Sequence, residues 1–170
     1  MTSIEDFTLS PEKRTEICAG LTPRQAELVG KWMDLHVVLN RGEFGQEMDD
    51  FFHPEMHYSN PNRPDLGSYA TWKTSPMALW NVFPPCVYRT VNAWGKGDDE
   101  ITVLCHHWGK HSGGRYWGHE PSGREINVWW YSTIKFKEDK IVHIYSIADV
   151  LSMLQGLGVI NVEMPKDPYA

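Results

Sequence analysis

Residues 125–149 read EINVWWYSTIKFKEDKIVHIYSIAD, and this stretch decides the fold class. Residues 125–136 and 141–147 are rich in β-branched and aromatic side chains, which favour strands. The polar residues 137–140 between them have the composition of a hairpin turn. The stretch therefore predicts two antiparallel strands that follow each other directly along the chain.

The preceding segments extend this pattern. Residues 88–94 and 101–111 have the same strand composition and are joined by a glycine-containing turn. Residues 23–39 carry apolar side chains at three- and four-residue steps after a capping Thr22, which predicts an amphipathic helix. A second short helix ending at Phe52 and a final one over 148–157 complete the prediction. Helices followed by an antiparallel meander indicate an α+β protein, with helices against one face of a curved sheet.

Large side chains occupy both faces of the strand 125–136. Trp129 and Trp130 are adjacent, so alternation places one on each face of the sheet. We therefore expect both faces to be covered, one by helices and the other by a cavity or a partner subunit. One of the two tryptophans is then a candidate wall of a binding pocket.

The composition limits the class of protein. The chain has 170 residues, of which 41% are hydrophobic and 22% charged, which is typical of one soluble globular domain. Its net charge of −6 gives no electrostatic footprint for nucleic acid, and no apolar run is long enough for a membrane span. We expect an N-terminal extension over 1–22, a domain over 23–160 and an irregular tail over 161–170.

The cysteines and the N-terminus indicate a compartment. Cys18, Cys86 and Cys105 are odd in number and far apart, which argues against a disulfide framework or a structural zinc site. The first residues lack a basic segment followed by an apolar one, the pattern of a secretory signal. A reducing cytoplasm is therefore the expected location.

Asp149 is the acidic residue of greatest chemical interest. It ends an apolar strand, where alternation places it on one face with Ile141, His143 and Tyr145. Apolar surroundings raise the pKa of a carboxyl group, and such a group acts as a general acid and base near neutral pH. Asp at this junction is also a common cap of the helix that follows. The sequence leaves both roles open.

Histidines supply a second set of candidates. His107 and His111 share one strand face, where an inward imidazole can hydrogen-bond a substrate carbonyl. Either one can equally be a core histidine with a satisfied partner. HxxxH on a strand does not bring two imidazoles together, and the chain has no HExxH, so we expect no metal site. His57 and Asn60 are candidates for the mouth of a cavity, or for simple turn hydrogen bonds.

Three segments together resemble one family. GKHSG followed by GHEPSGR in residues 109–124 is similar to the GTHxG…GxxPTGR signature of SnoaL-like polyketide cyclases. KIVHIYSIAD in 140–149 resembles their GKIVExWxxxD, and LQGLGV in 154–159 resembles their closing LxQLGV. The order and spacing of these segments extend the resemblance over residues 25–160. Tyr145 stands where the family usually has Trp, and Ser122 where it has Thr.

The resemblance implies a fold and a chemistry. The fold is nuclear-transport-factor-2-like, a cone-shaped curved antiparallel sheet packed on N-terminal helices around an apolar pocket. Its members often form dimers or tetramers through the sheet. The cyclases close a ring by intramolecular aldol condensation on a small hydrophobic molecule, without metal or cofactor. Their acid/base aspartate falls on Asp149.

Three functions follow from this comparison. The first is a cofactor-independent cyclase, or a related lyase or isomerase, on a polyketide-like or cyclic carbonyl substrate. Asp149 would move the proton and His111 or His107 would hydrogen-bond the carbonyl, while Tyr145 and one of the two adjacent tryptophans would shape the pocket. The second is a binding module of the same fold without turnover. The third is water addition of the epoxide-hydrolase type or a dehydration.

Overall fold

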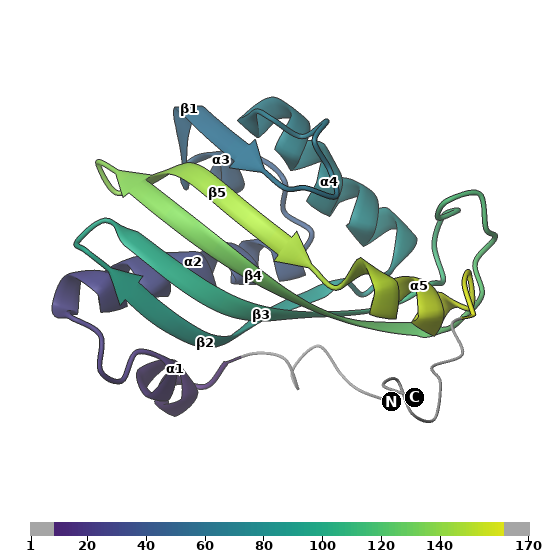
Figure 1. Cartoon of the computed structure of the whole chain (residues 1–170), viewed down its shortest axis with the longest axis horizontal. Helices are drawn as coiled ribbons and strands as arrows, with labels where there is room; N and C mark the ends of the chain where they lie inside the picture. The colour runs from purple at the N-terminus through teal and green to yellow at the C-terminus, as the bar shows by residue number, and fades with distance from the viewer. Residues whose placement is uncertain (1–8, 162–170) are drawn as a thin grey trace, which may run out of the picture.

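The computed structural model describes residues 9–161, and its centre is a curved five-stranded sheet (Figure 1). The strands lie in the order β1-β5-β4-β3-β2, with β1 parallel to β5 and the other neighbours antiparallel. Their bounds are β1 Phe52–Ser59, β2 Val87–Lys96, β3 Glu100–Lys110, β4 Glu125–Lys137 and β5 Lys140–Ala148. The antiparallel meander predicted from the sequence is confirmed.

Helices cover one face of this sheet. Figure 1 shows α2 and α4 behind the strands, and α5 beyond the end of β5 beside the long connection between β3 and β4. Within the described residues the helices are α1 Pro11–Ile17, α2 Pro23–Asn40, α3 Gln46–Asp49, α4 Tyr69–Val82 and α5 Val150–Leu157. This arrangement confirms the predicted α+β class with helices against one face of the sheet.

Helix α2 forms where its sequence signals predict it. The Thr22 hydroxyl accepts a hydrogen bond of 3.2 Å from the Gln25 amide, and the Gln25 side chain accepts one of 3.1 Å from the Thr22 amide. This capping box satisfies two amides that have no partner inside the helix. The apolar stripe, which includes Leu28, Trp32 and Leu35, is buried against β2 and β3. The helix therefore forms one wall of the core.

Strand β4 separates an inner face from an outer one. Ile126, Val128 and Ile134 are each at most 5% exposed and point toward the helices. Trp129 and Tyr131 lie on the opposite face and are 43% and 52% exposed. Within one chain, the helices cover the inner face of the sheet. The outer face, which we also expected to be covered, is exposed.

A bulge in β5 changes which residues face inward. Ile141 pairs with Phe136, whereas His143 pairs with the preceding residue of β4, so Val142 is an extra residue. Ile141 is buried while Tyr145 is exposed, because the extra residue reverses the alternation between them. The prediction that Ile141, His143 and Tyr145 share a face is therefore wrong.

Two predicted helix ends also differ from the structure. Helix α3 ends at Asp49, and Phe52, predicted as the end of that helix, opens β1 instead. Helix α5 begins at Val150 and not at residue 148, because the Asp149 side chain caps it from outside. Both differences move residues from a predicted helix into the sheet or its edge.

Helix α4 was not predicted from the sequence. The Ser68 hydroxyl accepts a hydrogen bond from the Thr71 amide, and the Thr71 hydroxyl accepts one from the Ser68 amide, which is a capping box. Pro76 lies inside the helix, and an interior proline usually indicates a helix end. Pro76 therefore argues against a helix in this segment, although the capping box at Ser68 predicts a helix start.

The segment expected to be an N-terminal extension contains α1. Ile17 at the end of this helix is 4% exposed and belongs to the main core. Arg14 reaches Asp34 of α2 at 2.6 Å, which ties the two helices together. Residues 1–8 and 162–170, which include nearly all of the predicted tail, lie outside the described residues.

Candidate functional site

A cavity of about 530 Å³ lies between the inner face of the sheet and helices α2, α4 and α5. This volume is in the range of small-molecule binding pockets. Its aromatic lining comes from Trp32, Tyr58, Trp72, Tyr88, Tyr116, Trp117 and Trp130. The aromatic lining suits a largely apolar ligand.

Four rings pack together on one side of this cavity. Tyr88 and His107 are stacked, with ring centroids 4.6 Å apart and planes 15° from parallel. The ring of His36 lies 6.0 Å from that of Tyr88 and 6.1 Å from that of Trp130. All four residues line the cavity. Two imidazoles are therefore placed inside an aromatic wall.

Burial keeps both imidazoles uncharged. It lowers the pKa of His36 to about 3, and burial, with a smaller effect of His106, lowers the pKa of His107 to about 3. At neutral pH each ring is neutral and has one N–H donor and one nitrogen acceptor. The site thus presents hydrogen-bonding groups to a ligand without presenting a positive charge.

Cys86 is the hydrogen-bond partner of His107. Its Sγ lies 2.9 Å from Nε2 of His107 and 3.3 Å from the hydroxyl of Tyr88. Burial raises the pKa of the Cys86 thiol to about 12, so it stays protonated at neutral pH. A thiol with such a pKa is a poor nucleophile.

Other polar groups of the lining are paired with one another. The hydroxyls of Ser132 and Ser146 lie 2.6 Å apart on the inner face of β4 and β5. Asn60 donates a hydrogen bond of 2.9 Å to the hydroxyl of Tyr58. Because these groups already have hydrogen-bond partners, they make the lining polar at these points without leaving a buried polar group unpaired.

The charged groups of the lining are exposed and ion-paired. Arg63 lies 2.7 Å from Asp65, and the Nε of Arg115 lies 2.6 Å from Glu120. The hydrogen bond to Asp65 raises the pKa of Arg63, so the charge is permanent. We therefore place the polar mouth of the cavity at the loops that carry these two arginines.

The structure brings three of the eight predicted site residues to the cavity and leaves five outside its lining. His107, Trp130 and Asn60 line the cavity. Trp129 and Tyr145 lie on the outer face of the sheet, where they are 43% and 41% exposed. His57 lies on the edge strand β1, where Met56 is buried and the His57 side chain is exposed with its ring 5.6 Å from that of His143.

Asp149 caps helix α5. Its Oδ1 accepts a hydrogen bond of 3.0 Å from the Ser152 amide, and the side chain is exposed to solvent. Hydrogen bonds from the Ser152 side chain and backbone lower the pKa of Asp149, so the expectation of a raised pKa is wrong. Its two chain neighbours, Ala148 and Val150, line the cavity. The carboxylate therefore lies at the cavity wall but points away from the apolar interior.

His111 is buried, and both of its ring nitrogens are engaged. Nδ1 accepts a hydrogen bond of 3.3 Å from the Ser122 amide, and Nε2 lies 3.1 Å from the carbonyl oxygen of Gly114. Since a carbonyl oxygen only accepts, the proton resides on Nε2. His111 thus ties together the two ends of the connection between β3 and β4.

That connection forms part of the cavity wall. It carries Tyr116, whose ring packs 5.1 Å from that of Phe83 and whose hydroxyl lies 3.7 Å from the sulfur of Met153. At Gly113 the backbone approaches the Asn81 carbonyl so closely that a Cβ would overlap its oxygen. The glycine and the buried histidine of the GKHSG segment therefore position this wall.

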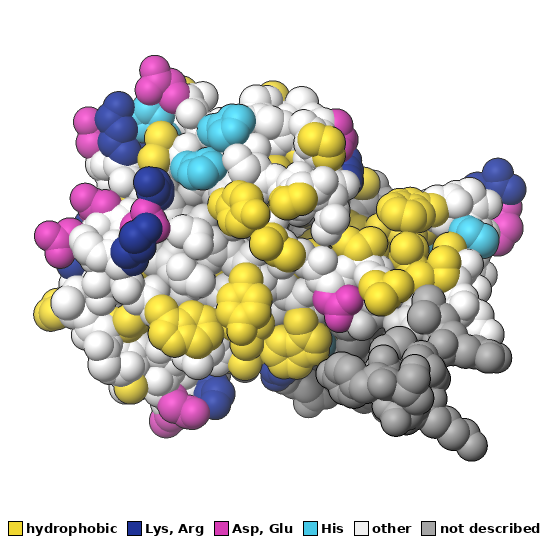
Figure 2. Space-filling view, viewed as in Figure 1, with side chains coloured by type: hydrophobic (Ala, Val, Ile, Leu, Met, Phe, Trp, Pro, Cys, Tyr) yellow, Lys and Arg dark blue, Asp and Glu magenta, His cyan; other side chains and the backbone are white. Residues whose placement is uncertain are grey.

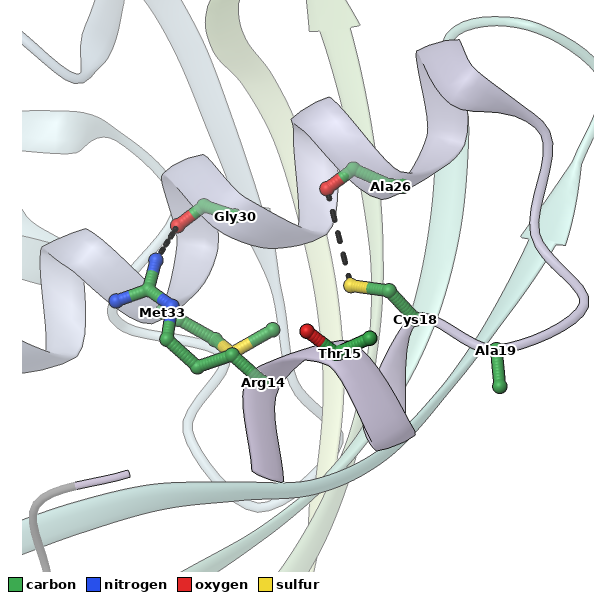
Figure 3. A pocket seen from close by; sticks show the side chains of 7 residues that line it. All are labelled: Arg14, Thr15, Cys18, Ala19, Ala26, Gly30 and Met33. Carbon is green, nitrogen blue, oxygen red and sulfur yellow. Dashed lines mark hydrogen bonds between the residues drawn. The ribbon is translucent and has the colours of Figure 1, made fainter. Parts of the chain in front are cut away.

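A second, more open hollow lies between α1 and α2 (Figure 3). Arg14 and Cys18, which line it, donate hydrogen bonds to the backbone carbonyls of Gly30 and Ala26. These polar groups hold one helix on the other. The hollow therefore has the character of a helix–helix seam, and the aromatic cavity is the candidate site.

No group of three or more His, Cys, Asp or Glu side chains within residues 9–161 is arranged to hold a metal ion. No helix there is long and apolar enough to cross a membrane.

Comparison with known families identifies the chain. The model of the SnoaL-like polyketide cyclase family matches residues 31–157. The chain belongs to this family. In this SnoaL-like chain the match spans every residue that lines the cavity, the connection between β3 and β4, and Asp149, which caps α5. No curated protein matches it significantly.

Solved structures share the SnoaL-like fold at low identity. AclR from Streptomyces galilaeus, a candidate hydroxylase, superposes with a TM-score of 0.73 at 17% identity, covering 84% of this chain and 91% of its own. IdmH from Streptomyces antibioticus, a candidate polyketide cyclase, gives 0.68 at 19%, covering 78% and 99%. A candidate SnoaL-like polyketide cyclase from Jannaschia sp. CCS1 gives 0.68 at 14%, covering 82% and 97%. At these identities the likeness shows the fold alone.

Sequence reasoning missed Tyr88, which lines the cavity, and Cys86, which lies behind it in contact with the Tyr88 hydroxyl. Tyr88 pairs with His107 across β2 and β3, so the histidine's position predicts it once the register is known. His36 lies within the predicted helix 23–39, but the sequence did not indicate that its side chain reaches the cavity. These assignments require the pairing of distant segments, which single-sequence patterns do not give.

Proposed function

We propose that this chain is a cofactor-independent cyclase, or a related lyase or isomerase, that acts on a hydrophobic polyketide-like or cyclic carbonyl compound. The observation that carries the proposal is His107, an uncharged imidazole in the wall of an aromatic cavity of about 530 Å³. Carbonyl chemistry needs a donor where negative charge develops on oxygen. The family match supports the same class of reaction.

His107 is the group we assign to the carbonyl oxygen. It lines the cavity, whereas both nitrogens of His111 are occupied by the connection it holds. A neutral imidazole donates a hydrogen bond to a developing oxyanion without forming an ion pair with the substrate. His111 then supports the cavity wall, and His107 contacts the substrate.

Asp149 remains our candidate for the proton transfer, on the basis of the resemblance in residues 140–149. In an aldol closure it removes a proton next to one carbonyl, the resulting enolate carbon bonds to a second carbonyl carbon, and the proton returns to the alkoxide oxygen. Its lowered pKa keeps it ionised and able to accept a proton. To reach the cavity the side chain must leave the Ser152 amide and turn toward the lining residues Ala148 and Val150.

A binding module is the second candidate, and the position of Asp149 favours it. The carboxylate is satisfied as a helix cap and is exposed, which a purely structural role explains without catalysis. In that case the cavity binds a hydrophobic carbonyl compound and releases it unchanged.

We also propose that a second copy of the chain covers the outer face of the sheet. Figure 2 shows hydrophobic side chains gathered in the middle of this face, with charged ones toward its margins. Its exposed large side chains are Trp94, Trp129, Tyr131, Tyr145 and Ile147. An uncharged apolar centre is compatible with a two-fold interface, in which the same patch meets itself. The free thiols of Cys18, Cys86 and Cys105 suit the reducing cytoplasm that we propose as the compartment.

Hydrogen–deuterium exchange tests the proposed chemistry without knowledge of the natural product. The chain is incubated in D2O with hydrophobic aryl and cyclic ketones, and mass spectrometry follows deuterium uptake next to the carbonyl. We expect exchange above the buffer rate, reduced about 10²–10⁴-fold in Asp149→Asn if Asp149 is the general base. Asp98→Asn, which changes an exposed turn carboxylate, is the matched control.

The same experiment separates the two candidates. Saturable binding of these ketones, measured by calorimetry, with no exchange above buffer for any of them favours the binding module. Parental exchange in a folded Asp149→Asn variant removes Asp149 from the mechanism but leaves the cavity as the site.

A further inference from the structure

His36 is the second imidazole of the cavity wall, and the reaction proposed above gives it no task. It lies on α2 about one helical turn after Trp32, and the centroids of the two rings are 5.0 Å apart. The His36 side chain is 4% exposed and lines the cavity. Burial lowers the pKa of His36 to about 3, so the ring is uncharged at neutral pH. It therefore presents hydrogen-bonding nitrogens to the cavity and no charge.

The two ring nitrogens of His36 have different surroundings. Nδ1 lies 3.3 Å from the hydroxyl oxygen of Thr90, which is fully buried in β2. No other group within residues 9–161 forms a hydrogen bond with this ring, so Nε2 has no partner in that part of the chain. Nε2 is also not one of the polar atoms that the protein encloses completely. Because the side chain lines the cavity, the space left at Nε2 belongs to the cavity.

A ring nitrogen in this position needs a polar partner. In the neutral ring Nε2 is either an N–H donor or an acceptor, depending on the tautomer, and either one is unfavourable when it is left unpaired. A carbonyl or hydroxyl oxygen of a ligand satisfies the donor, and a hydroxyl proton satisfies the acceptor. Nε2 therefore recognises an oxygen function of the ligand in both tautomers.

His36 and His107 border the same two aromatic rings. The ring of Tyr88 lies 6.0 Å from that of His36 and 4.6 Å from that of His107. The ring of Trp130 lies 6.1 Å from the first imidazole and 6.4 Å from the second. One ligand packed against these rings can meet both histidines. An aldol closure joins two carbonyl groups of one molecule, and His107 accounts for one of them.

We propose that Nε2 of His36 binds a second oxygen function of the ligand, a carbonyl or a hydroxyl, so that the cavity selects compounds with two oxygen functions over the matching monoketones. This rests on the proposed function, in which His107 binds the first carbonyl. His36 is then a specificity-determining residue that contacts the substrate. A ligand with a single carbonyl leaves one of the two imidazoles unpaired and binds more weakly.

Three matched ketones test this selection by calorimetry with the full chain at pH 7. Valerophenone has one carbonyl, phenacylacetone has a second carbonyl on the same chain, and ω-hydroxyvalerophenone has a terminal hydroxyl in addition to its carbonyl. We expect at least one of the two compounds with two oxygen functions to bind roughly 2- to 10-fold more tightly than valerophenone, the gain of about one hydrogen bond. Equal or weaker binding of both overturns the proposal.

Variants assign the preference to His36. His36→Leu is expected to abolish it, because the second oxygen loses its partner, while the affinity for valerophenone changes little. His36→Gln keeps a side-chain donor and acceptor and is expected to retain part of the preference. His106→Leu, which removes a buried histidine outside the cavity lining, is the matched control and should retain all of it. A purely structural role of His36 would weaken the binding of all three ketones alike, and an unchanged preference in His36→Leu overturns the proposal.

Nitrogen NMR of the parental chain covers the case in which His36→Leu does not fold. The ring resonances of His36 are assigned by their loss in His36→Gln, and a compound with two oxygen functions is expected to shift Nε2 more than valerophenone does. Equal shifts with all three ketones overturn the proposal.

Failure of the proposed function has a different signature. If none of the three ketones binds, or if His107→Leu binds them as the parental chain does, the carbonyl site at His107 is rejected and this proposal with it. Equal binding of all three ketones that is weakened in His107→Leu rejects the role of His36 and leaves the site at His107 in place.

Discussion

The Oδ1 of Asp149 accepts a hydrogen bond of 3.0 Å from the backbone amide of Ser152 and so caps helix α5. Asn caps helices about as well as Asp, whereas Ala does not. We therefore predict that Asp149→Ala lowers the free energy of unfolding by about 1 kcal/mol, and that Asp149→Asn changes it little. Urea unfolding of the two variants measures this.

The same pair of variants separates the cap from catalysis. If the carboxylate also moves a proton, both variants lose ketone exchange although only one loses stability. A variant pair that loses exchange in proportion to stability would reduce Asp149 to a structural residue.

The two buried cavity histidines predict a pH dependence of stability. Their folded pKa values of about 3 lie below the value of about 6.5 for an unfolded histidine, so the unfolded chain binds more protons between these limits. Stability is then complete above pH 6.5 and is lost as the pH falls toward 3, by about 1.4 kcal/mol per pH unit for each histidine. Unfolding midpoints measured from pH 7 to pH 4 test this.

Variants isolate the histidine contribution from that of the carboxylates. His36→Gln is predicted to reduce the slope of stability against pH by about 1.4 kcal/mol per unit within this window. His119→Gln, which changes an exposed residue, serves as control. An unchanged slope in His36→Gln would mean that this imidazole is already charged or solvated in the folded chain.

His111 is predicted to act on the cavity through the connection between β3 and β4. His111→Ala removes the hydrogen-bond partner of the Ser122 amide and of the Gly114 carbonyl, and the loss of each hydrogen bond costs about 0.5–1.5 kcal/mol. We expect weaker ketone binding and a raised KM, with a smaller change in kcat than in His107→Leu. Binding measured by calorimetry and steady-state exchange give the two quantities. A large loss of kcat with unchanged KM would instead place His111 at the reacting atoms.

The adjacent tryptophans provide a matched pair. Trp130 lines the cavity and Trp129 lies on the outer face, so we predict that Trp130→Leu weakens ketone binding whereas Trp129→Leu does not. Calorimetric titration of both variants with the same ketone is the measurement. Equal losses would mean that the outer face contributes to ligand binding.

The outer face is predicted to be a contact between two copies. Tyr131, whose ring stacks on that of Trp94 at 6.1 Å, lies within the exposed apolar patch. Tyr131→Glu places a charge there and is expected to convert a dimer into a monomer in sedimentation experiments, because burying an unpaired charge is costly. Trp117→Glu, in the loop beside the cavity, is expected to leave the dimer intact. A parental chain that sediments as a monomer rejects this interface.

The sequence predicted the sheet better than the cavity, for physical reasons. Alternation in 125–136 correctly assigned one tryptophan to each face, because the period of a strand depends on local geometry alone. Alternation failed in 141–149, where the extra residue Val142 reverses the faces, since a bulge depends on pairing with β4. The register of a distant strand is not encoded locally, so the contact of Cys86 with His107 was not foreseen.

The spacing of the two histidines also did not predict their separate roles. Alternation placed His107 and His111 on one face of a strand without indicating whether that face is the inner one; in the structure His107 lies in β3, His111 directly follows it, and both are buried. The cavity extends to His107 but not to His111, because the β3–β4 connection folds over the latter and occupies its nitrogens. Alternation thus predicted that the two residues share a face, whereas tertiary packing determines which of them lines the cavity.

The most direct test of the central claim is a structure of the chain with a bound hydrophobic ketone. We predict the carbonyl oxygen within about 3 Å of a ring nitrogen of His107, a hydrogen-bond distance, with the ligand ring against Trp130. A ligand bound between α1 and α2, or bound in the cavity with its carbonyl turned away from His107, would contradict the account.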